Sequence, residues 1–264
     1  MNQKLNDFFA LQLNTWPLAS ANYAKLREVE TRTIEIDGYP VRMHYNPARA
    51  VSSQAKLDPD SIAARPCFLC HCNRPEEQMF EPLLERYSLL VNPFPICTRH
   101  FTLAANQHEP QKINGRLDDM LRLAHKFEGD YVLFNGAKSG ASAPDHFHFQ
   151  LVNAEWFHIP VERTCYFIHR IVLQNDRLTE IKEAYDALSF QSDIVNLFCR
   201  YEAGVWTLTV FPRKQHRPIQ FFDGSFLVSP GAIDMTGNLI ITRESDFERI
   251  TATDIVDIYR QVSL

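Results

Sequence analysis

Hydrophobic and polar residues alternate regularly in one stretch near the middle of the chain, HFHFQLV, at residues 146–152. Side chains of a β-strand point alternately to its two faces, so residues i, i+2 and i+4 share a face. The pattern predicts a strand with His146, His148 and Gln150 on one face and phenylalanines on the other, in the core. Two readings are open at this point. Either the polar face is merely solvated, or it presents a ligand, a nucleophile and an amide to one small volume.

Other periodic segments predict the remaining elements, since apolar spacings of three and four indicate helices and apolar runs bounded by turn residues indicate strands. We expect helices at residues 4–13, 20–30, 116–127 and 253–262. We expect strands at residues 87–96, 100–108, 131–135, 146–152, 226–230 and 238–243, and hairpins over 31–47, turning near Asp37-Gly38, and over 194–218. The order strand, strand, helix, strand, loop, strand predicts an α+β fold with an antiparallel sheet and helices.

The strand order partly returns in the second part of the chain. The segments HFTLAANQHEP and TLTVFPRKQHRP both run from an apolar strand into a Q-H-x-P sequence. This match, together with the repeated order, predicts two unequal pseudo-duplicated halves. The first, residues 1–165, contains the C-x-x-C pair and the H-x-H sequence, and the second, residues 166–264, contains neither.

Composition and charge narrow the class of protein. The chain has 264 residues, of which 45% are hydrophobic and 22% charged, which is typical of one large globular domain or two small ones. Its net charge of −5 argues against a nucleic-acid polymer as the main partner, because such binding relies on clustered Lys and Arg. A small anionic ligand held by a few placed groups stays compatible with this charge.

The N-terminal sequence MNQKLNDFFALQLNTW is too polar for a signal peptide. No apolar run approaches the roughly 18 residues that indicate a membrane span. We therefore expect a cytoplasmic protein without a membrane partner.

The six cysteines need an explanation other than disulfides, which a reducing compartment disfavours. Cys97, Cys165 and Cys199 are scattered among apolar neighbours and read as small core residues. Cys67 and Cys70 form a C-x-x-C pair between prolines, a spacing that lets two thiolates of a tight turn bind one Zn²⁺. A redox pair has the same spacing, but no thioredoxin-like strand-to-helix pattern surrounds it. Zinc would need two more ligands.

Four segments occur in an order known from one superfamily: YNPAR, CFLC, VNPFPICTRHFTLAANQH and FNGAKSGASAPDHFHFQ. A fifth, FLVSPGAIDMTGNLIITRESDFERIT, follows in the second half. With these motifs the chain resembles the histidine-triad superfamily, in the branch of galactose-1-phosphate uridylyltransferase, diadenosine tetraphosphate phosphorylase and the GDP-hexose phosphorylases. The resemblance spans residues 45–262. It implies a histidine-triad-like (HIT-like) α+β fold in which the second half contributes to the substrate pocket.

The resemblance also implies roles for the residues of the H-x-H-x-Q motif. His148 would attack the α-phosphorus of a nucleotide and form a covalent nucleotidyl-histidine, since a neutral imidazole is nucleophilic near neutral pH. Gln150 would donate a hydrogen bond to a non-bridging oxygen of that phosphate. Further residues expected to bind substrate or phosphate are Asn135, Gly140, Ala141, Ser142, Asn92, Phe94 and Arg49.

The same resemblance implies a metal site that completes the C-x-x-C pair. In the uridylyltransferase the zinc ligands match Cys67, Cys70, His108 and His146 of this sequence. A closed Cys₂His₂ set of this kind is structural, so we expect a structural Zn²⁺. The alternative is a metal-free site, as in several relatives, with His146 as a hydrogen-bonding partner.

The function implied by these residues is that of a nucleotidyltransferase or phosphorylase. Its substrate would be a nucleoside diphosphate sugar or a dinucleoside polyphosphate, and the intermediate a nucleotidyl-histidine. The alternatives are a HIT-type nucleotide hydrolase, a nucleotide-binding or regulatory protein without turnover, and a zinc-stabilised interaction module. The base, the acceptor (a sugar phosphate, inorganic phosphate or water) and the choice between a monomer and a homodimer are left open by the sequence.

Overall fold

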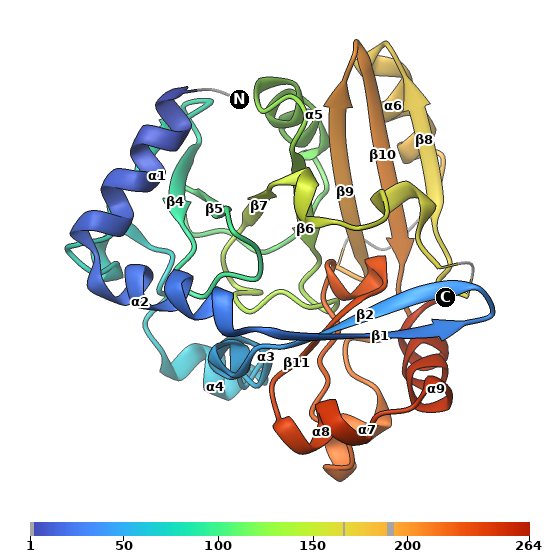
Figure 1. Cartoon of the computed structure of the whole chain (residues 1–264). Helices are drawn as coiled ribbons and strands as arrows, with labels where there is room; N and C mark the ends of the chain where they lie inside the picture. Colours follow the sequence, from blue (N-terminus) through green and yellow to red (C-terminus); the bar gives the residue numbers. More distant parts are fainter. Residues whose placement is uncertain (1–2, 166, 189–192) are drawn as a thin grey trace.

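A large antiparallel sheet forms the centre of the computed structural model, which describes residues 3–165, 167–188 and 193–264 (Figure 1). Its eight strands lie in the order β3-β4-β5-β7-β6-β9-β10-β8. They are β3 (Glu81–Leu83), β4 (Tyr87–Val91), β5 (His100–Ala105), β6 (Tyr131–Asn135), β7 (His148–Val152), β8 (Ile171–Asn175), β9 (Val195–Glu202) and β10 (Val205–Pro212). The strand and hairpin expectations that fall on β4, β5, β6, β9 and β10 are confirmed.

A second, three-stranded sheet lies across one end of the large one (Figure 1). Strands β1 (Glu30–Ile36) and β2 (Tyr39–Tyr45) form the expected hairpin, and Asp37 and Gly38 turn it with φ values of 50° and 82°. Two consecutive positive φ angles suit a type I′ turn, whose twist matches that of the strands. Strand β11 (Asn238–Ile241) pairs in parallel with β2, so a late segment of the chain completes an early hairpin.

Helices cover one face of the large sheet, and the small sheet with further helices covers the other (Figure 1). The first face packs against residues of α1 (Gln3–Thr15), α5 (Leu117–Lys126) and α6 (Leu178–Asp186), and the second against β1, β2, β11 and α9 (Ala252–Val262). The remaining helices are α2 (Pro17–Lys25), α3 (Ala50–Ser53), α4 (Pro59–Ala64), α7 (Ile219–Asp223) and α8 (Glu244–Arg249).

The alternation of residues 146–152 separates the two cores. Phe147, Phe149 and Leu151 are buried on the side of α1 and α5, as expected. Val152 belongs to the opposite core, and the alternation of the strand places His148 and Gln150 on that same face. Strand β7 begins at His148, so the expectation that it includes His146 is wrong. The backbone N–H of His146 instead donates to Ala143 in the preceding turn.

The topology contains an internal repeat. The elements β5-α5-β6-β7 pair in the spatial order β5-β7-β6, and the elements β8-α6-β9-β10 pair in the corresponding order β8-β10-β9. Strands β6 and β9 pair with each other and join the two units into one sheet. The Q-H-x-P match indicated a repeat but paired the wrong elements of the two units. It aligns β5 with β10, whereas the topology makes β8 the counterpart of β5. The division into domains at residue 165 stays a prediction.

Two local expectations need correction, and two further elements were not expected. Residues 226–230 are not a strand, because their backbone turns into a loop. The helix expected over 20–30 ends at Lys25 and is followed by a 3₁₀ turn and β1. Neither β8 nor α6 was expected from the sequence. The side chains of β8 alternate between half-buried and exposed at the sheet edge, so its hydrophobic contrast is weak.

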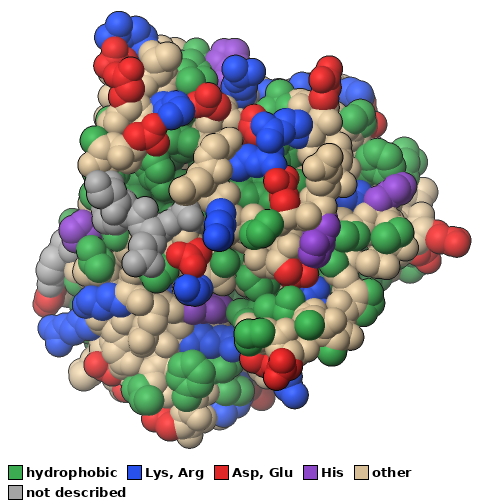
Figure 2. Space-filling view, turned by 180° about the vertical axis from the view of Figure 1, so that it is seen from behind, with side chains coloured by type: hydrophobic (Ala, Val, Ile, Leu, Met, Phe, Trp, Pro, Cys, Tyr) green, Lys and Arg blue, Asp and Glu red, His purple; other side chains and the backbone are tan. Residues whose placement is uncertain are grey.

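Helix hydrophobicity and surface charge can indicate whether a protein contacts a membrane or a highly charged partner. No helix among the described residues combines the length and the apolar character that crossing a membrane requires. On the face shown in Figure 2, Lys and Arg side chains are interspersed with Asp and Glu.

Candidate functional site

Four side chains distant in sequence meet beside the start of β7. Cys67 and Cys70 come from the turn after α4, His108 follows β5, and His146 precedes β7. The Cys67 Sγ–His146 Nδ1 and Cys70 Sγ–His108 Nδ1 distances are both 3.3 Å. One ligand atom from each of the four residues lies within 4.8 Å of all the others.

These distances suit a metal ion. Tetrahedral Zn²⁺ with nitrogen and sulfur ligands holds its ligand atoms roughly 3.3 to 3.8 Å apart. The Nε2–H of His146 donates to the carbonyl of Ala105 at 2.8 Å, which leaves Nδ1 facing the thiols. Such a second hydrogen bond fixes the tautomer of a ligating histidine. Burial raises the pKa of the Cys67 thiol, but the neighbouring His146 side chain and hydrogen bonds from backbone amides outweigh this effect and lower the pKa to about 6. The donor set therefore fits a structural zinc.

His148 lies two residues further on and is held in one tautomer. Its Nδ1 is 2.9 Å from the carbonyl oxygen of His146. A carbonyl can only accept, so Nδ1 carries the proton and Nε2 carries the lone pair. Nε2 makes no hydrogen bond with the described residues, and the side chain is 4% exposed. Burial lowers the pKa of His148 to about 4, so the imidazole is neutral.

Gln111 fixes the backbone of His148, a role that no sequence pattern indicated. Its Oε1 accepts from the N–H of His148 at 2.7 Å, and its Nε2 donates to the carbonyls of His148 and Asn135 at 2.9 and 2.8 Å. The side chain is fully buried. One amide thus bridges the ends of β6 and β7 where their pairing stops, and it sets the position from which the imidazole projects.

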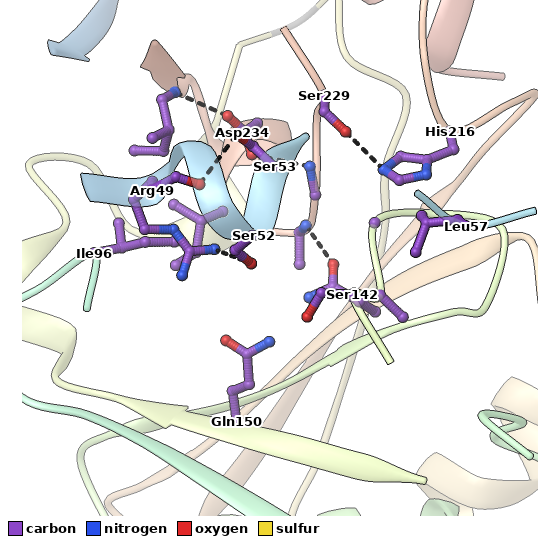
Figure 3. Close-up of a pocket in the computed structure, with 17 residues that line it drawn as sticks. Arg49, Ser52, Ser53, Leu57, Ile96, Ser142, Gln150, His216, Ser229 and Asp234 are labelled. Carbon is purple, nitrogen blue, oxygen red and sulfur yellow. Dashed lines mark hydrogen bonds between the residues drawn. The ribbon is translucent and has the colours of Figure 1, made fainter. Parts of the chain in front are cut away.

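A small polar cavity of about 60 Å³ opens above β7 (Figure 3). Both halves of the chain contribute to it. The first half supplies Asn135, Gly140, Ala141, Ser142 and Gln150 from β6, β7 and the loop between them, and Arg49, Ser52, Ser53 and Leu57 from the segment around α3. The second half supplies His216, Ser229 and residues 231–234. His148 does not line this cavity, although it shares a strand face with Gln150.

Arg49 provides positive charge at the cavity. Its Nη1 donates to the carbonyl of Phe94 at 2.5 Å and its Nη2 to Ser52 Oγ at 3.2 Å. Burial lowers the pKa of Arg49 to about 10, so the guanidinium stays protonated at neutral pH. It forms no ion pair within the described part of the chain. Figure 3 shows the amide of Gln150 extending from β7 toward Arg49 and Ser52. The arrangement can receive a small anion.

Asn135 ties the loop of residues 136–145 to the second half. Its side-chain oxygen accepts from Asn196 Nδ2 at 2.9 Å and from the N–H of Ala232 at 2.7 Å. Asn196 and Asn135 are partners in the β6–β9 register, and Asn196 also donates to the carbonyl of Ser139 at 2.6 Å. Asn135 therefore supports the loop as well as lining the cavity.

The second half was expected to contribute to the substrate pocket, but the sequence did not identify which of its residues line the cavity. Ser229 Oγ lies 3.0 Å from His216 Nε2, and the two side chains form one wall of the cavity (Figure 3). Burial and nearby arginines lower the pKa of His216 to about 3. The carboxylate of Asp234 accepts from the N–H groups of Gly231 and Ile240 at 2.9 and 2.8 Å. The Q-H-x-P sequence was the one signal for His216, and it carried no hint of Ser229.

Asn92 and Phe94, which were expected near the nucleotide, are not among the residues that line the cavity. Asn92 instead stabilises the turn after β4: its Oδ1 accepts from the N–H of Phe94 at 2.9 Å, and its Nδ2 donates to Thr102 at 3.1 Å. Phe94 enters the site through its backbone carbonyl, which holds Arg49.

The fold is similar to that of a yeast enzyme whose structure is known, as expected from the sequence. A structure of yeast Ap4A phosphorylase Apa2 is similar with a TM-score of 0.59 at 13% identity, covering 95% of this chain and 97% of that chain. Its complex with Ap4A gives 0.63 at 17% identity with the same coverage, and its complex with AMP gives 0.55 at 15%, covering 93% and 94%. At these identities the likeness shows the fold alone.

The family itself follows from a sequence profile. The family described as a domain of unknown function, DUF4922, matches residues 8–153, more than half of the chain. The protein therefore belongs to the DUF4922 family. No curated protein matches the sequence.

Proposed function

We propose that the protein transfers a nucleotidyl group through a covalent adduct on His148. The observation that carries the proposal is the state of this imidazole: the His146 carbonyl holds the proton on Nδ1, and Nε2 bears a lone pair without a partner among the described residues. A neutral, oriented imidazole is what nucleophilic attack on phosphorus requires. A merely solvated polar strand would not need its histidine buried and held in one tautomer.

In the first step, the lone pair of Nε2 forms a P–N bond with the α-phosphorus of the substrate. The bond from that phosphorus to the leaving oxygen breaks, and its electron pair departs with the leaving phosphate group. Gln150 and the N–H groups of Gly140 and Ser142 are suited to stabilise charge on the phosphate oxygens, because fixed donors act most strongly in a buried site. Arg49 supplies the balancing positive charge at the same cavity.

In the second step, an acceptor oxygen attacks the same phosphorus, the P–N bond breaks, and its electron pair returns to Nε2. One difficult displacement is thus divided into two. We propose a dinucleoside polyphosphate or a nucleoside diphosphate sugar as the donor, with phosphorolysis or nucleotidyl transfer as the reaction. The shared fold with yeast Apa2, which is named as an Ap4A phosphorylase and whose complexes contain Ap4A and AMP, supports a nucleotide donor.

We further propose that Cys67, Cys70, His108 and His146 bind one structural Zn²⁺. When bound, the metal would link the cysteine turn to the chain just before β7. The carbonyl of His146 orients His148, so a fixed position of His146 also serves the nucleophile. His146 and His148 then have separate tasks, one in holding the metal and one in forming the adduct.

The test is to incubate the protein with Ap4A and with nucleotide sugars labelled with ³²P at the α-phosphate. We expect one class of nucleotide to leave label on the protein that is labile to acid and stable to base, as a phosphoramidate is. His148→Ala should abolish the label, whereas His169→Ala, at an exposed histidine outside the site, should retain it. Label at the normal rate in His148→Ala contradicts the proposed nucleophile. Binding of a nucleotide without any label contradicts turnover and favours a passive binding protein.

A further inference from the structure

We infer that His100 is a positioning residue that sets the side-chain amide of Gln150 with its NH₂ group toward the cavity. This inference deepens the proposed function and rests on it, because it explains how one of the phosphate donors is oriented. His100 is the first residue of β5, is fully buried and does not line the cavity. Its action on a substrate would therefore pass through Gln150.

The directions of the hydrogen bonds follow from the backbone. The N–H of Ile96 points to Nδ1 of His100 at 3.3 Å. A backbone N–H can only donate, so Nδ1 is the acceptor, and the proton of a neutral imidazole lies on Nε2. That Nε2–H faces Gln150 Oε1 at 2.6 Å. The oxygen end of the amide is thereby held by His100, and the NH₂ end is turned to the other side.

The opposite amide orientation is disfavoured for the same reason. If the Gln150 amide rotated by half a turn, its NH₂ group would face the Nε2–H of His100. Two donors would then point at each other, and the hydrogen bond would be lost. Restoring a hydrogen bond would require moving the imidazole proton to Nδ1, where it would meet the N–H of Ile96. Burial, and then the charge of Arg49, lower the pKa of His100 to about 3, so protonation does not offer a second donor arrangement near neutral pH.

His100 is itself held in place from two sides. The hydroxyl of Tyr23, on α2, donates to the His100 carbonyl at 2.8 Å and lies 3.3 Å from its N–H. In the β5–β7 register His100 is opposite Val152, and Gln150 is opposite Thr102, so the two side chains belong to one rigid strand pair. A donor fixed in this way needs no reorganisation when charge develops on the substrate.

The matched test uses two substitutions of similar size. The side chain of glutamine places an NH₂ group near the position of the imidazole Nε2, whereas methionine has similar length and no donor. We expect His100→Met to lower the rate of adduct formation with Ap4A about tenfold or more, mainly in kcat and less in KM, because the charge on the phosphate grows in the transition state. His100→Gln should stay within about threefold of the wild type.

A double-mutant cycle separates positioning from a general structural effect. If His100 acts through Gln150, then His100→Met should cause no further loss of rate in a Gln150→Ala background, because residues that act as a unit are not additive. Independent, multiplying losses would overturn the inference. Equal losses for His100→Gln and His100→Met, in variants with the wild-type midpoint of urea unfolding, would also overturn it.

An NMR measurement that needs no turnover tests the role of His100 independently of the proposed function. Long-range ¹H–¹⁵N NMR of the wild-type protein should show His100 as the neutral Nε2–H tautomer, and Gln150→Ala should shift that Nε2–H resonance. An Nδ1–H tautomer, or an Nε2–H resonance that does not shift in Gln150→Ala, would overturn the inference even if the protein is an active enzyme. Failure of every nucleotide to label His148 would instead overturn the proposed function and leave the NMR result to decide the role of His100.

Discussion

Gly140 and Gly231 are in contact through their backbones: a β-carbon on Gly140 would lie 2.5 Å from the Cα of Gly231. The first residue belongs to the loop before β7 and the second to the loop before β11, and both line the cavity. Gly140 also has a φ of +107°, in the region that L side chains rarely adopt. The two halves of the chain therefore meet at the loop before β7 through a contact that leaves no room for a side chain.

We expect Gly140→Ala to lower both the free energy of unfolding and the rate of adduct formation. The new methyl group meets backbone rather than a flexible side chain, so the loop must move away from Gly231. Gly204→Ala is the matched control, because Gly204 also has a positive φ of +83° but no atom within 4 Å of the position that a β-carbon would take. In urea unfolding, Gly140→Ala should cost at least about 1 kcal/mol more than Gly204→Ala. Equal losses would contradict the role of the Gly231 contact.

The zinc proposal predicts about one Zn²⁺ per chain in the purified protein. Cys67→Ser should lower both the zinc content and the thermal midpoint, because metal binding is coupled to folding. Cys72→Ser is the control: Cys72 lies in the same turn, is exposed, and does not belong to the four-residue cluster. Atomic absorption and thermal unfolding measure the two effects. Stoichiometric zinc in a variant without Cys67 and Cys70 would disprove this ligand set.

Substitutions of the two histidines of the H-x-H sequence should have different effects on zinc content, stability and activity. His146→Ala should lose zinc or stability together with activity, since His146 Nδ1 faces both cysteines. His148→Ala should leave a folded, zinc-loaded protein whose rate falls by on the order of 10³ or more, because the covalent route is lost. Zinc analysis, circular dichroism and label transfer distinguish the two. If His146→Ala kept zinc and fold while His148→Ala lost both, the assigned roles would be reversed.

Gln150→Ala should cost less than His148→Ala, about 10²-fold in rate, because one donor is lost while the nucleophile remains. If the proposed function holds, the wild-type protein should show ping-pong kinetics and net retention of configuration at phosphorus, as two successive displacements require. Chiral phosphorothioate substrates measure the stereochemistry. Net inversion would indicate a single displacement by the acceptor and would remove the adduct from the mechanism.

Acid should destabilise the fold through His44, which is buried, hydrogen-bonded to Asn238 at 3.2 Å and stacked on Trp156. Burial, with smaller effects of Arg42 and His158, lowers its pKa to about 4 against the opposing Asn238 bond. An unfolded histidine titrates near about 6.5, so the unfolded chain binds the proton first as the pH falls through this window. The stability that neutral His44 provides is present above about pH 6.5 and is lost toward pH 4.

Urea unfolding at several pH values measures this contribution. Between pH 7 and pH 4 the wild type should lose about 2 to 3 kcal/mol more of its unfolding free energy than His44→Gln loses. His169→Gln, at an exposed position, should follow the wild type. Parallel curves for the wild type and His44→Gln would show that His44 is not held neutral by the fold.

Sequence periodicity was sufficient to predict those features of the fold that depend on residues close together in the chain. The alternation around Phe147 and Phe149 placed both rings in the core, and Asp37-Gly38 located the first hairpin. The motifs that resemble those of the histidine-triad superfamily predicted the fold. They also predicted that four side chains lie together, those of Cys67, Cys70, His108 and His146, and these four residues do meet in the structure. In these cases the signal is local: a strand alternates with period two, and a tight turn needs residues that tolerate a positive φ.

The sequence alone determined the class of fold, the strand that carries His148 and Gln150, and the residues of the expected metal site. The tertiary structure decided what surrounds them: the pairing of His100 with Gln150, the bridge made by Gln111, the contact of Gly140 with Gly231 and the parallel pairing of β11 with β2. Each of these relationships joins segments far apart in the chain. Their partners are chosen by packing and hydrogen-bond satisfaction between whole elements, and the periodicity of a single segment carries no information about which distant segment it will meet.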